Sequence, residues 1–244
     1  MLREKTQLDL VFVPWGTGDV DQHVVRGTAW LRRQAGRPAV FVPAKGNYER
    51  NGTLPRLLPG IQVLTERNRH REHWSGGPLL VCWPTEKMLG LLSDGLAGRL
   101  TAACVLEWGE APYQRAWLTA RGAVDLTTGR PAAGTGLALP PVVHAAMRQL
   151  NQRVNHANGL GGQYDRGLAI ATLTTLVRHG HRFDIDDLCA WALANGFTAS
   201  EVERLRDFGA KALRGHRFQV TGSGLLPPDI VAVWQAEAHD IRGG

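Results

Sequence analysis

Three tryptophans are the clearest candidates for ligand contact in this chain. Trp15, Trp83 and Trp108 each end a short apolar run, and each is followed by Gly or Pro. If these runs are parallel strands of one sheet, the three indoles meet at its carboxyl edge, where open α/β sheets bind ligands. Indoles at such an edge could stack on nucleotide bases, or they could simply close the end of a hydrophobic core.

A glycine pair and two aspartates follow the first tryptophan. Gly16 and Gly18 lie between an expected strand and an expected helix, where backbone N–H groups can bind phosphate. Asp21 stands where the dinucleotide-binding fingerprint has its third glycine. With Asp19 it would repel a pyrophosphate while capping the helix well. The segment is therefore either a capped turn or a site for a ribose, an amine or a metal-bridged ligand.

Glu107 interrupts an otherwise apolar strand next to Trp108. A carboxyl group near indole rings could have a raised pKa and act as a general acid or base. It could equally form an ion pair at the strand end. Glu107, Asp19 and Asp21 are the catalytic candidates if the protein is an enzyme. The spacing of His, Cys and acidic residues assigns no metal site, and no cofactor is identified.

Cationic and amide side chains follow the remaining expected strands and would meet at the same edge. Lys45 and Asn47 come after the second strand, Arg67 and Arg69 after the third, and Lys87 after the fourth. They could bind phosphate, or they could be solvated loop residues.

The charge distribution points to the front half of the chain. The 244 residues carry a formal net charge of +6, with 24 Arg and only 4 Lys. Residues 1–139 hold 17 basic and 12 acidic side chains, whereas residues 140–244 hold 11 and 10. Attraction to nucleic acid would therefore come from residues 1–139. The absence of a long apolar run and the three scattered cysteines predict a cytoplasmic protein with no membrane partner.

Alternation of strand and helix patterns predicts the fold class. Apolar runs at 8–13, 39–42, 61–64, 79–82 and 101–106 are typical of buried strands, and helical patterns cover 19–34 and 85–96. A Gly/Pro-rich loop is expected at 46–60, and residues 126–136 have linker composition. We predict an α/β protein with a Rossmann-like, mostly parallel sheet in residues 1–130, followed by an all-helical domain in residues 140–244.

The helical half contains a segment that resembles a helix-turn-helix, at 184–220. Helices are expected at 184–194 and 198–213, with a capping box of Thr198 and Glu201, and a short wing at 215–220. This layout is that of a major-groove reader, but acidic residues crowd the first turns of the second helix. The basic residues of that helix are Arg204, Arg206, Lys211 and Arg214. A plain helical bundle is the alternative.

An amide-rich stretch precedes this segment. Asn151, Asn155 and Asn158 have the spacing of one helical face, and His156 lies among them. Asn155 and His156 are candidates for contact with a ligand or a partner, although a helix that ends at 158–159 would explain part of the pattern.

At 151–159 and at 190–196 the chain resembles an uncharacterised family of actinobacterial hypothetical proteins. The resemblance extends over most of the chain, on short motifs, and agrees with the excess of arginine. It implies an α/β front and a helical tail. No activity is established for that family, so the resemblance implies no function and no catalytic residue.

The sequence thus gives three functional hypotheses. The first is a nucleotide- or nucleic-acid-binding protein that uses the carboxyl edge of the sheet. The second is an enzyme that acts on a nucleotide or another phosphorylated small molecule. The third is a protein-interaction scaffold, in which the helical domain forms a homodimer or binds a partner chain.

Overall fold

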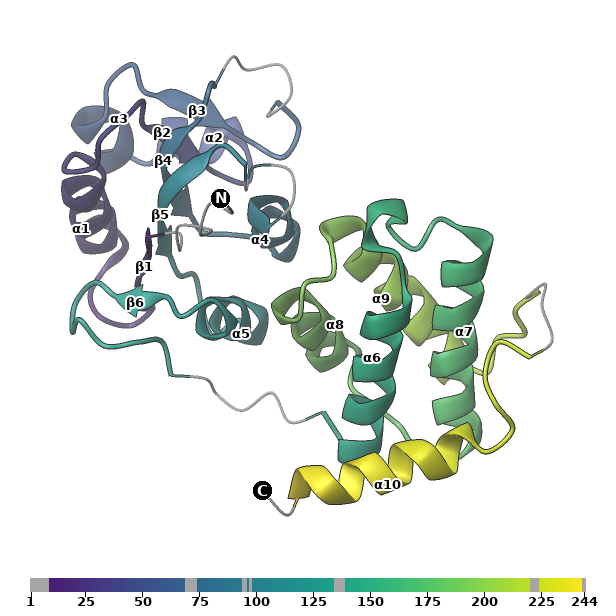
Figure 1. Cartoon of the computed structure of the whole chain (residues 1–244). Helices are drawn as coiled ribbons and strands as arrows, with labels where there is room; N and C mark the ends of the chain where they lie inside the picture. The colour runs from purple at the N-terminus through teal and green to yellow at the C-terminus, as the bar shows by residue number, and fades with distance from the viewer. Residues whose placement is uncertain are drawn as a thin grey trace, which may run out of the picture. The chain divides into compact units, whose positions relative to one another are not determined.

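The computed structural model describes residues 9–68, 74–93, 96, 98–133, 139–219 and 224–242. The chain divides into two compact units, residues 1–134 and 135–244 (Figure 1). The first unit contains a parallel sheet with helices, and the described residues of the second are helical. The predicted fold class is thereby confirmed. Within the described residues, no helix is long and apolar enough to span a membrane.

The sheet of unit 1 consists of six strands in the order β3-β2-β4-β5-β1-β6, and every adjacent pair is parallel. β4 is buried along its whole length, as expected for a parallel strand that is covered on both faces. The strands are β1 (Asp9–Val13), β2 (Ala39–Phe41), β3 (Gln62–Leu64), β4 (Gly77–Cys82), β5 (Leu100–Leu106) and β6 (Val124–Asp125).

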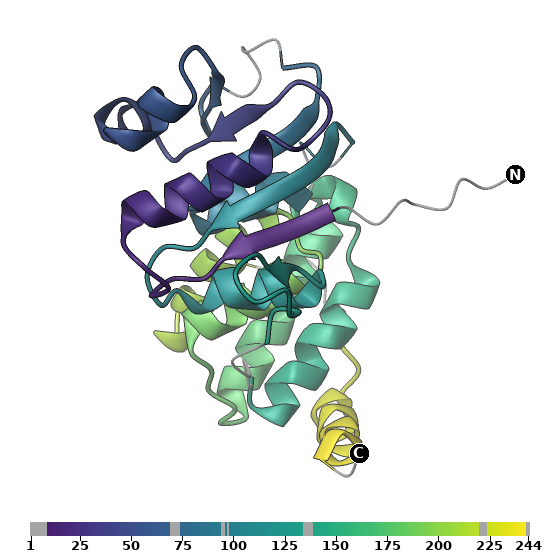
Figure 2. The same cartoon turned by 90° about the vertical axis from the view of Figure 1, so that its left-hand side faces the viewer.

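Helices cover both faces of this sheet. α1 and α3 pack together on one face, and α4 and α5 on the other (Figure 1; in Figure 2 the purple α1 crosses in front of the sheet). The helices are α1 (Val20–Leu31), α2 (Lys45–Arg50), α3 (Thr53–Leu57), α4 (Glu86–Ser93) and α5 (Pro112–Ala120).

The prediction of a loop at 46–60 is wrong, because α2 and α3 occupy most of this segment. Side-chain amides accept hydrogen bonds from backbone N–H groups at the starts of these short helices. Asn47 accepts a hydrogen bond from the Ala44 amide at 3.0 Å, and Asn51 accepts one from the Leu54 amide at 2.8 Å. Asparagine side chains commonly bind neighbouring backbone groups in this way. Each helix is too short to display a periodic apolar pattern, which is why the sequence did not reveal them.

Unit 2 is built from α6 (Pro141–Arg153), a 3-10 turn η1 (His156–Asn158), α7 (Gln163–Arg178), α8 (Ile185–Ala194), α9 (Ala199–Leu213) and α10 (Ile230–Arg242). α7 and α8 pack against α9, and α10 packs against α6. The fully buried Trp234 of α10 donates from its indole nitrogen to Gln149 of α6 at 2.8 Å.

Two expectations for unit 2 are wrong. α6 ends at Arg153 and Val154 is extended, so Asn155 does not share a helical face with Asn151. Asn155 instead caps η1 and accepts a hydrogen bond from the Ala157 amide at 3.1 Å. The wing was expected at 215–220: no strand is present at 215–219, and residue 220 lies outside the described residues. The predicted capping box of α9 is confirmed.

Close packing of α1 on the sheet depends on Gly27. A Cβ at this position would come within 2.7 Å of Leu80 and 2.8 Å of Leu106, both of which are fully buried. Gly27→Ala should therefore lower the free energy of unfolding by about 1–3 kcal/mol through overpacking, although alanine favours helix. Urea denaturation of the variant measures the change.

Gly46 of α2 is the matched control, since its added Cβ would meet only the Arg50 side chain, at 3.9 Å. Gly46→Ala should leave stability unchanged or raise it by up to about 1 kcal/mol. Equal losses in the two variants would contradict the packing argument.

Candidate functional site

The three strand-ending tryptophans lie together at the carboxyl edge of the sheet. The ring centroids of Trp15 and Trp108 are 4.9 Å apart, and those of Trp83 and Trp108 are 6.2 Å apart, both edge-to-face. Trp15 is 39% exposed and Trp108 48%, whereas Trp83 is half-buried. Core closure is therefore not the role of Trp15 and Trp108, whose rings present apolar surface to solvent.

A cleft opens at the point where the connections of two neighbouring strands diverge. After β2 the chain runs through α2 and α3 to β3, and after β4 it runs through α4 to β5, on the opposite side. Such a switch point is where open α/β sheets bind ligands. The cleft has a volume of about 730 Å³. Its lining residues are Val20, Pro43, Ala44, Gly46, Asn47, Arg50, Asn51, Trp83, Pro84, Thr85, Trp108 and Tyr113.

The polar groups of this cleft are mainly donors. The hydroxyl of Thr85 donates to Glu66 at 2.6 Å, and that of Tyr113 donates to the Pro84 carbonyl at 3.0 Å, so both are used within the protein. The side-chain oxygens of Asn47 and Asn51 accept backbone hydrogen bonds, which leaves their NH₂ groups to donate. Arg50 adds an exposed guanidinium. None of the described lining residues is acidic.

Trp83 has a strained backbone. Its φ is +55°, in the left-handed region that bulky side chains rarely adopt. The Trp83 amide donates to the Leu106 carbonyl at 3.2 Å, which holds the turn against the end of β5. Strain of this kind persists where surrounding structure enforces it, and it clusters at ligand sites.

Gln114 of α5 fixes the loops that carry Trp83 and Trp108. Its side-chain oxygen accepts from the Trp108 amide at 2.9 Å, and its NH₂ donates to the Trp108 carbonyl at 3.1 Å and the Pro84 carbonyl at 3.3 Å. Gln114 is only 2% exposed. One buried amide therefore connects the ends of β4 and β5, and sequence reasoning missed it because α5 was not predicted.

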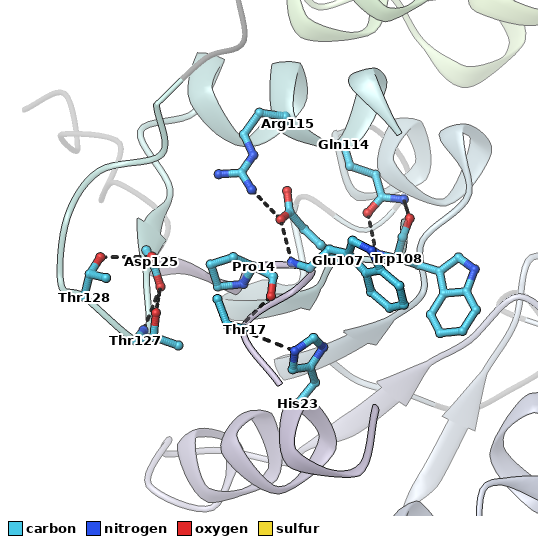
Figure 3. A network of polar contacts seen from close by, with 11 residues as sticks. Pro14, Thr17, His23, Glu107, Trp108, Gln114, Arg115, Asp125, Thr127 and Thr128 are labelled. Carbon is cyan, nitrogen blue, oxygen red and sulfur yellow. Dashed lines mark hydrogen bonds and ion pairs between the residues drawn. The ribbon is translucent and has the colours of Figure 1, made fainter. Parts of the chain in front are cut away.

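Glu107 joins the ends of β5 and β1 (Figure 3). It is 4% exposed, and its Oε2 accepts from the Arg115 guanidinium at 2.6 Å and from the Trp15 amide at 3.1 Å. Burial raises the pKa of the Glu107 carboxyl, although Arg115 and the Trp15 amide act in the opposite direction. Glu107 does not line the cleft and supports the position of Trp15.

Glu107 binds the backbone of Trp15, and His23 of α1 contacts its indole ring. The Thr17 hydroxyl donates to the Pro14 carbonyl at 2.8 Å, so His23 Nε2, 3.4 Å away, must be the donor in its contact with that hydroxyl (Figure 3). The His23 ring lies edge-on to Trp15, with centroids 6.1 Å apart. Burial and the nearby Arg26 lower the pKa of His23, which favours the neutral ring, and the contact with Thr17 then places its proton on Nε2.

The glycine and aspartate segment after β1 forms a turn into α1. Gly16 and Gly18 have positive φ, and Asp19 caps α1 by accepting from the Gln22 amide at 2.8 Å. Asp21 accepts from the Thr53 hydroxyl at 2.6 Å, which connects α1 to α3. None of these four residues lines the cleft. Their observed contacts are those of a capped turn.

The predicted phosphate-binding side chains are spread over the unit. Asn47 lines the cleft. Lys45, next to it, pairs with Glu49 at 3.3 Å on the surface of α2. Arg67 is exposed after β3 and Lys87 is exposed on α4, both outside the cleft lining. Arg69 lies outside the described residues.

Of the lining residues, sequence reasoning predicted only Asn47, Trp83 and Trp108. Among the polar ones it missed Arg50, Asn51 and Tyr113. Arg50 and Asn51 follow β2, so the rule that pointed to Asn47 could have included them. Tyr113 comes from α5, which the sequence pattern did not reveal.

Asn155 and His156 belong to unit 2 and hold the turn between α6 and α7. His156 Nδ1 lies 2.9 Å from Oε2 of the fully buried Glu201, which also accepts from the Thr198 amide at 2.7 Å. The backbone N–H of Asn155 donates to the Asp165 carboxylate at 3.3 Å. The contact of His156 fastens η1 to the start of α9, and that of Asn155 fastens it to the start of α7.

The helix-turn-helix segment pairs part of its basic side chains internally. Arg206 forms an ion pair with Asp186, and Lys211 pairs with Asp207 at 2.8 Å. Both pairs lower the positive charge available to DNA phosphates. In the described part of the chain, no three His, Cys, Asp or Glu side chains gather as metal ligands.

The strain at Trp83 predicts an unusual order of stability among its variants. Trp83→Gly should be about 1 kcal/mol more stable than Trp83→Ala, because glycine adopts positive φ without a steric cost. Urea denaturation of the two variants measures the difference. At Trp108, whose φ is not positive, the glycine variant should be no more stable than the alanine variant. If the glycine variant were the less stable of the two at position 83 as well as at position 108, the argument for strain at Trp83 would fail.

The raised pKa of Glu107 predicts a pH-dependent stability. The folded state binds the Glu107 proton more tightly than the unfolded state does, so this residue's contribution falls as pH rises from the ordinary pKa of 4.5 to the raised one. Relative to Glu107→Gln, the wild type should therefore lose free energy of unfolding over that interval. Urea titrations at a series of pH values test this, and a gain with rising pH would contradict it.

Comparisons with known proteins concern unit 2. Residues 139–235 match a family model described as a domain of unknown function, DUF1889. No curated protein and no solved structure gives a significant match. The match agrees with an uncharacterised family, and the actinobacterial origin stays a prediction. Over its helical unit, the chain is similar to a family that has no assigned function.

Proposed function

We propose that unit 1 binds a nucleotide in the cleft between the ends of β2 and β4. The observation that carries this proposal is the cleft itself, at a topological switch point and flanked by the indoles of Trp83 and Trp108. Its volume of about 730 Å³ lies within the range of small-molecule and cofactor sites. Aromatic walls suit a flat base, which can stack on an indole.

The donors of the cleft favour a ligand rich in acceptors. Arg50 and the NH₂ groups of Asn47 and Asn51 can bind phosphate or sugar oxygens. The described lining contains no carboxylate, and the nearby Glu66 carboxylate accepts a hydrogen bond from the Thr85 hydroxyl. In this proposal the base packs against Trp108 and Trp83, and the phosphate lies near Arg50.

We propose binding rather than catalysis. Asp19 caps α1, Asp21 holds Thr53 and Glu107 holds Arg115 and the Trp15 amide. Each predicted catalytic carboxylate thus has a structural partner, and none lines the cleft.

Single-stranded nucleic acid is a second candidate ligand for the same edge. It is favoured by the exposure of Trp15 and Trp108, whose adjacent rings could stack on successive bases. The excess of basic over acidic residues in the front half supports this candidate. A homodimer or partner contact through unit 2 and a cytoplasmic location stay predictions from the sequence.

Calorimetric titration of the full chain with AMP, GMP, UMP and adenosine tests the proposal. Trp108→Ala should weaken binding of AMP and adenosine alike, by about tenfold for the loss of a stacking partner. Arg50→Gln should weaken AMP by about tenfold and leave adenosine unchanged, because only AMP carries the phosphate.

Arg56→Gln is the matched control, since Arg56 is an exposed arginine of α3 outside the cleft lining. It should leave every affinity unchanged. An oligo-dT titration separates the second candidate: binding that falls steeply with salt and needs both Trp15 and Trp108 identifies a nucleic-acid surface. Absence of binding by all these ligands at millimolar concentration would overturn the proposal.

A further inference from the structure

Unit 2 contains the same four-residue sequence twice. Gly-His-Arg-Phe occupies 180–183, after α7, and again 215–218, after α9. The glycine has positive φ in both copies, +79° at Gly180 and +74° at Gly215. Such glycines end helices by turning the backbone into the left-handed region.

The two copies cap their helices with the same hydrogen bonds. In the first copy the His181 amide donates to the Leu176 carbonyl at 2.9 Å. In the second the His216 amide donates to the Lys211 carbonyl at 3.0 Å. Each glycine amide also donates to the carbonyl three residues earlier, which completes a Schellman motif. Helix capping therefore accounts for the glycines and the backbone, but not for the side chains that follow.

The side chains of the two copies have different surroundings. Phe183 is 7% exposed and packs beside Gly209 of α9, where an added Cβ would come within 3.3 Å of its ring. Phe218 is only half-buried, and its ring lies edge-on to Phe208 and His216, with centroids 6.2 and 5.0 Å away. The first copy thus closes the core, whereas the second leaves part of its phenylalanine accessible.

The accessible phenylalanine borders a pocket of about 790 Å³ between α7 and the second copy. Apolar groups of α7, Leu225 and Leu226 share its lining with Phe218. Its basic side chains are Arg178, His216 and Arg217. None of the described lining residues is acidic, and neither guanidinium has an ion pair or a hydrogen bond within the described part of the chain.

Helix dipoles explain the position of only one of the two guanidinium groups, that of Arg178. Arg178 lies in the last turn of α7, where a cation complements the partial negative charge of the helix end. Arg217 lies four residues beyond the end of α9 at Leu213, where this effect has decayed. A guanidinium that borders an apolar pocket without a partner can bind a carboxylate or phosphate in bidentate geometry.

We propose that this pocket binds a small amphiphilic anion, in which a carboxylate or phosphate monoester is attached to an apolar chain. The head group lies between Arg178 and Arg217, and the chain lies along α7 against Phe218. The pocket volume falls in the range of small-molecule sites. This inference concerns unit 2 and does not depend on the nucleotide cleft of unit 1.

Calorimetric titration of the full chain with octanoate and octyl phosphate tests the proposal, with 1-octanol and inorganic phosphate as probes of each half of the ligand. At least one octyl anion should bind about tenfold more tightly than octanol and inorganic phosphate do. The anion that binds identifies the head group.

The repeat supplies a matched pair of variants. Arg217→Gln should weaken binding of the octyl anion about tenfold, because a charge-assisted hydrogen bond is lost. Arg182→Gln changes the equivalent residue of the first copy, which does not line the pocket, and should leave binding unchanged. Phe218→Ala should weaken the octyl anions and leave inorganic phosphate unaffected. Thermal unfolding of each variant shows whether it remains folded.

Several results would overturn the proposal. If 1-octanol bound as tightly as the octyl anions, the charged head group would contribute nothing to binding. If inorganic phosphate bound as tightly as the octyl anions, the apolar wall would contribute nothing. Equal losses in Arg217→Gln and Arg182→Gln would indicate non-specific attraction. Binding of duplex DNA that needs Arg178 and Arg217, without binding of either octyl anion, would instead identify a nucleic-acid contact.

Discussion

The burial of β4 between β2 and β5 is the constraint on which the rest of unit 1 depends. A parallel strand in the middle of a sheet needs helices on both faces, and each connection must cross over to reach its neighbour. The connections that leave β2 and β4 run in opposite directions. The position of the cleft therefore follows from strand order, and the side chains around it determine its shape.

Buried polar side chains determine how that space is lined. Gln114 connects the loops after β4 and β5, and Glu107 connects the end of β5 to that of β1. Both are nearly inaccessible, so each hydrogen bond is made where an unpaired polar group would be costly. These bonds hold Trp15, Trp83 and Trp108 in contact at the edge without burying two of them. The indoles of Trp15 and Trp108 are therefore held in place by buried polar groups while part of each ring stays exposed.

The sequence predicted the sheet and the meeting of the three tryptophans because both follow from local pattern. Buried strands are continuous apolar runs, and residues at their carboxyl ends must share one edge. It did not predict Gln114 or Asn51, because nothing in their local sequence indicates which distant backbone groups they bind. Short helices such as α2 likewise depend on capping and tertiary packing more than on periodicity. At Asn155 a local pattern misled the prediction. Its spacing from Asn151 suggested one continuous helix, but α6 ends at Arg153 and Val154 is extended.

Unit 2 shows why local sequence is an incomplete guide to chemistry. The two Gly-His-Arg-Phe segments have the same capping hydrogen bonds, yet one phenylalanine closes a core and the other borders a pocket. The difference comes from what packs opposite each copy: Gly209 lets Phe183 approach α9, whereas Phe218 faces α7 across open space. The capping geometry is thus a structural necessity in both places, and its surroundings leave a pocket beside only the second copy. The family match covers unit 2 and not the cleft of unit 1, so whatever chemistry that family shares concerns the helical unit.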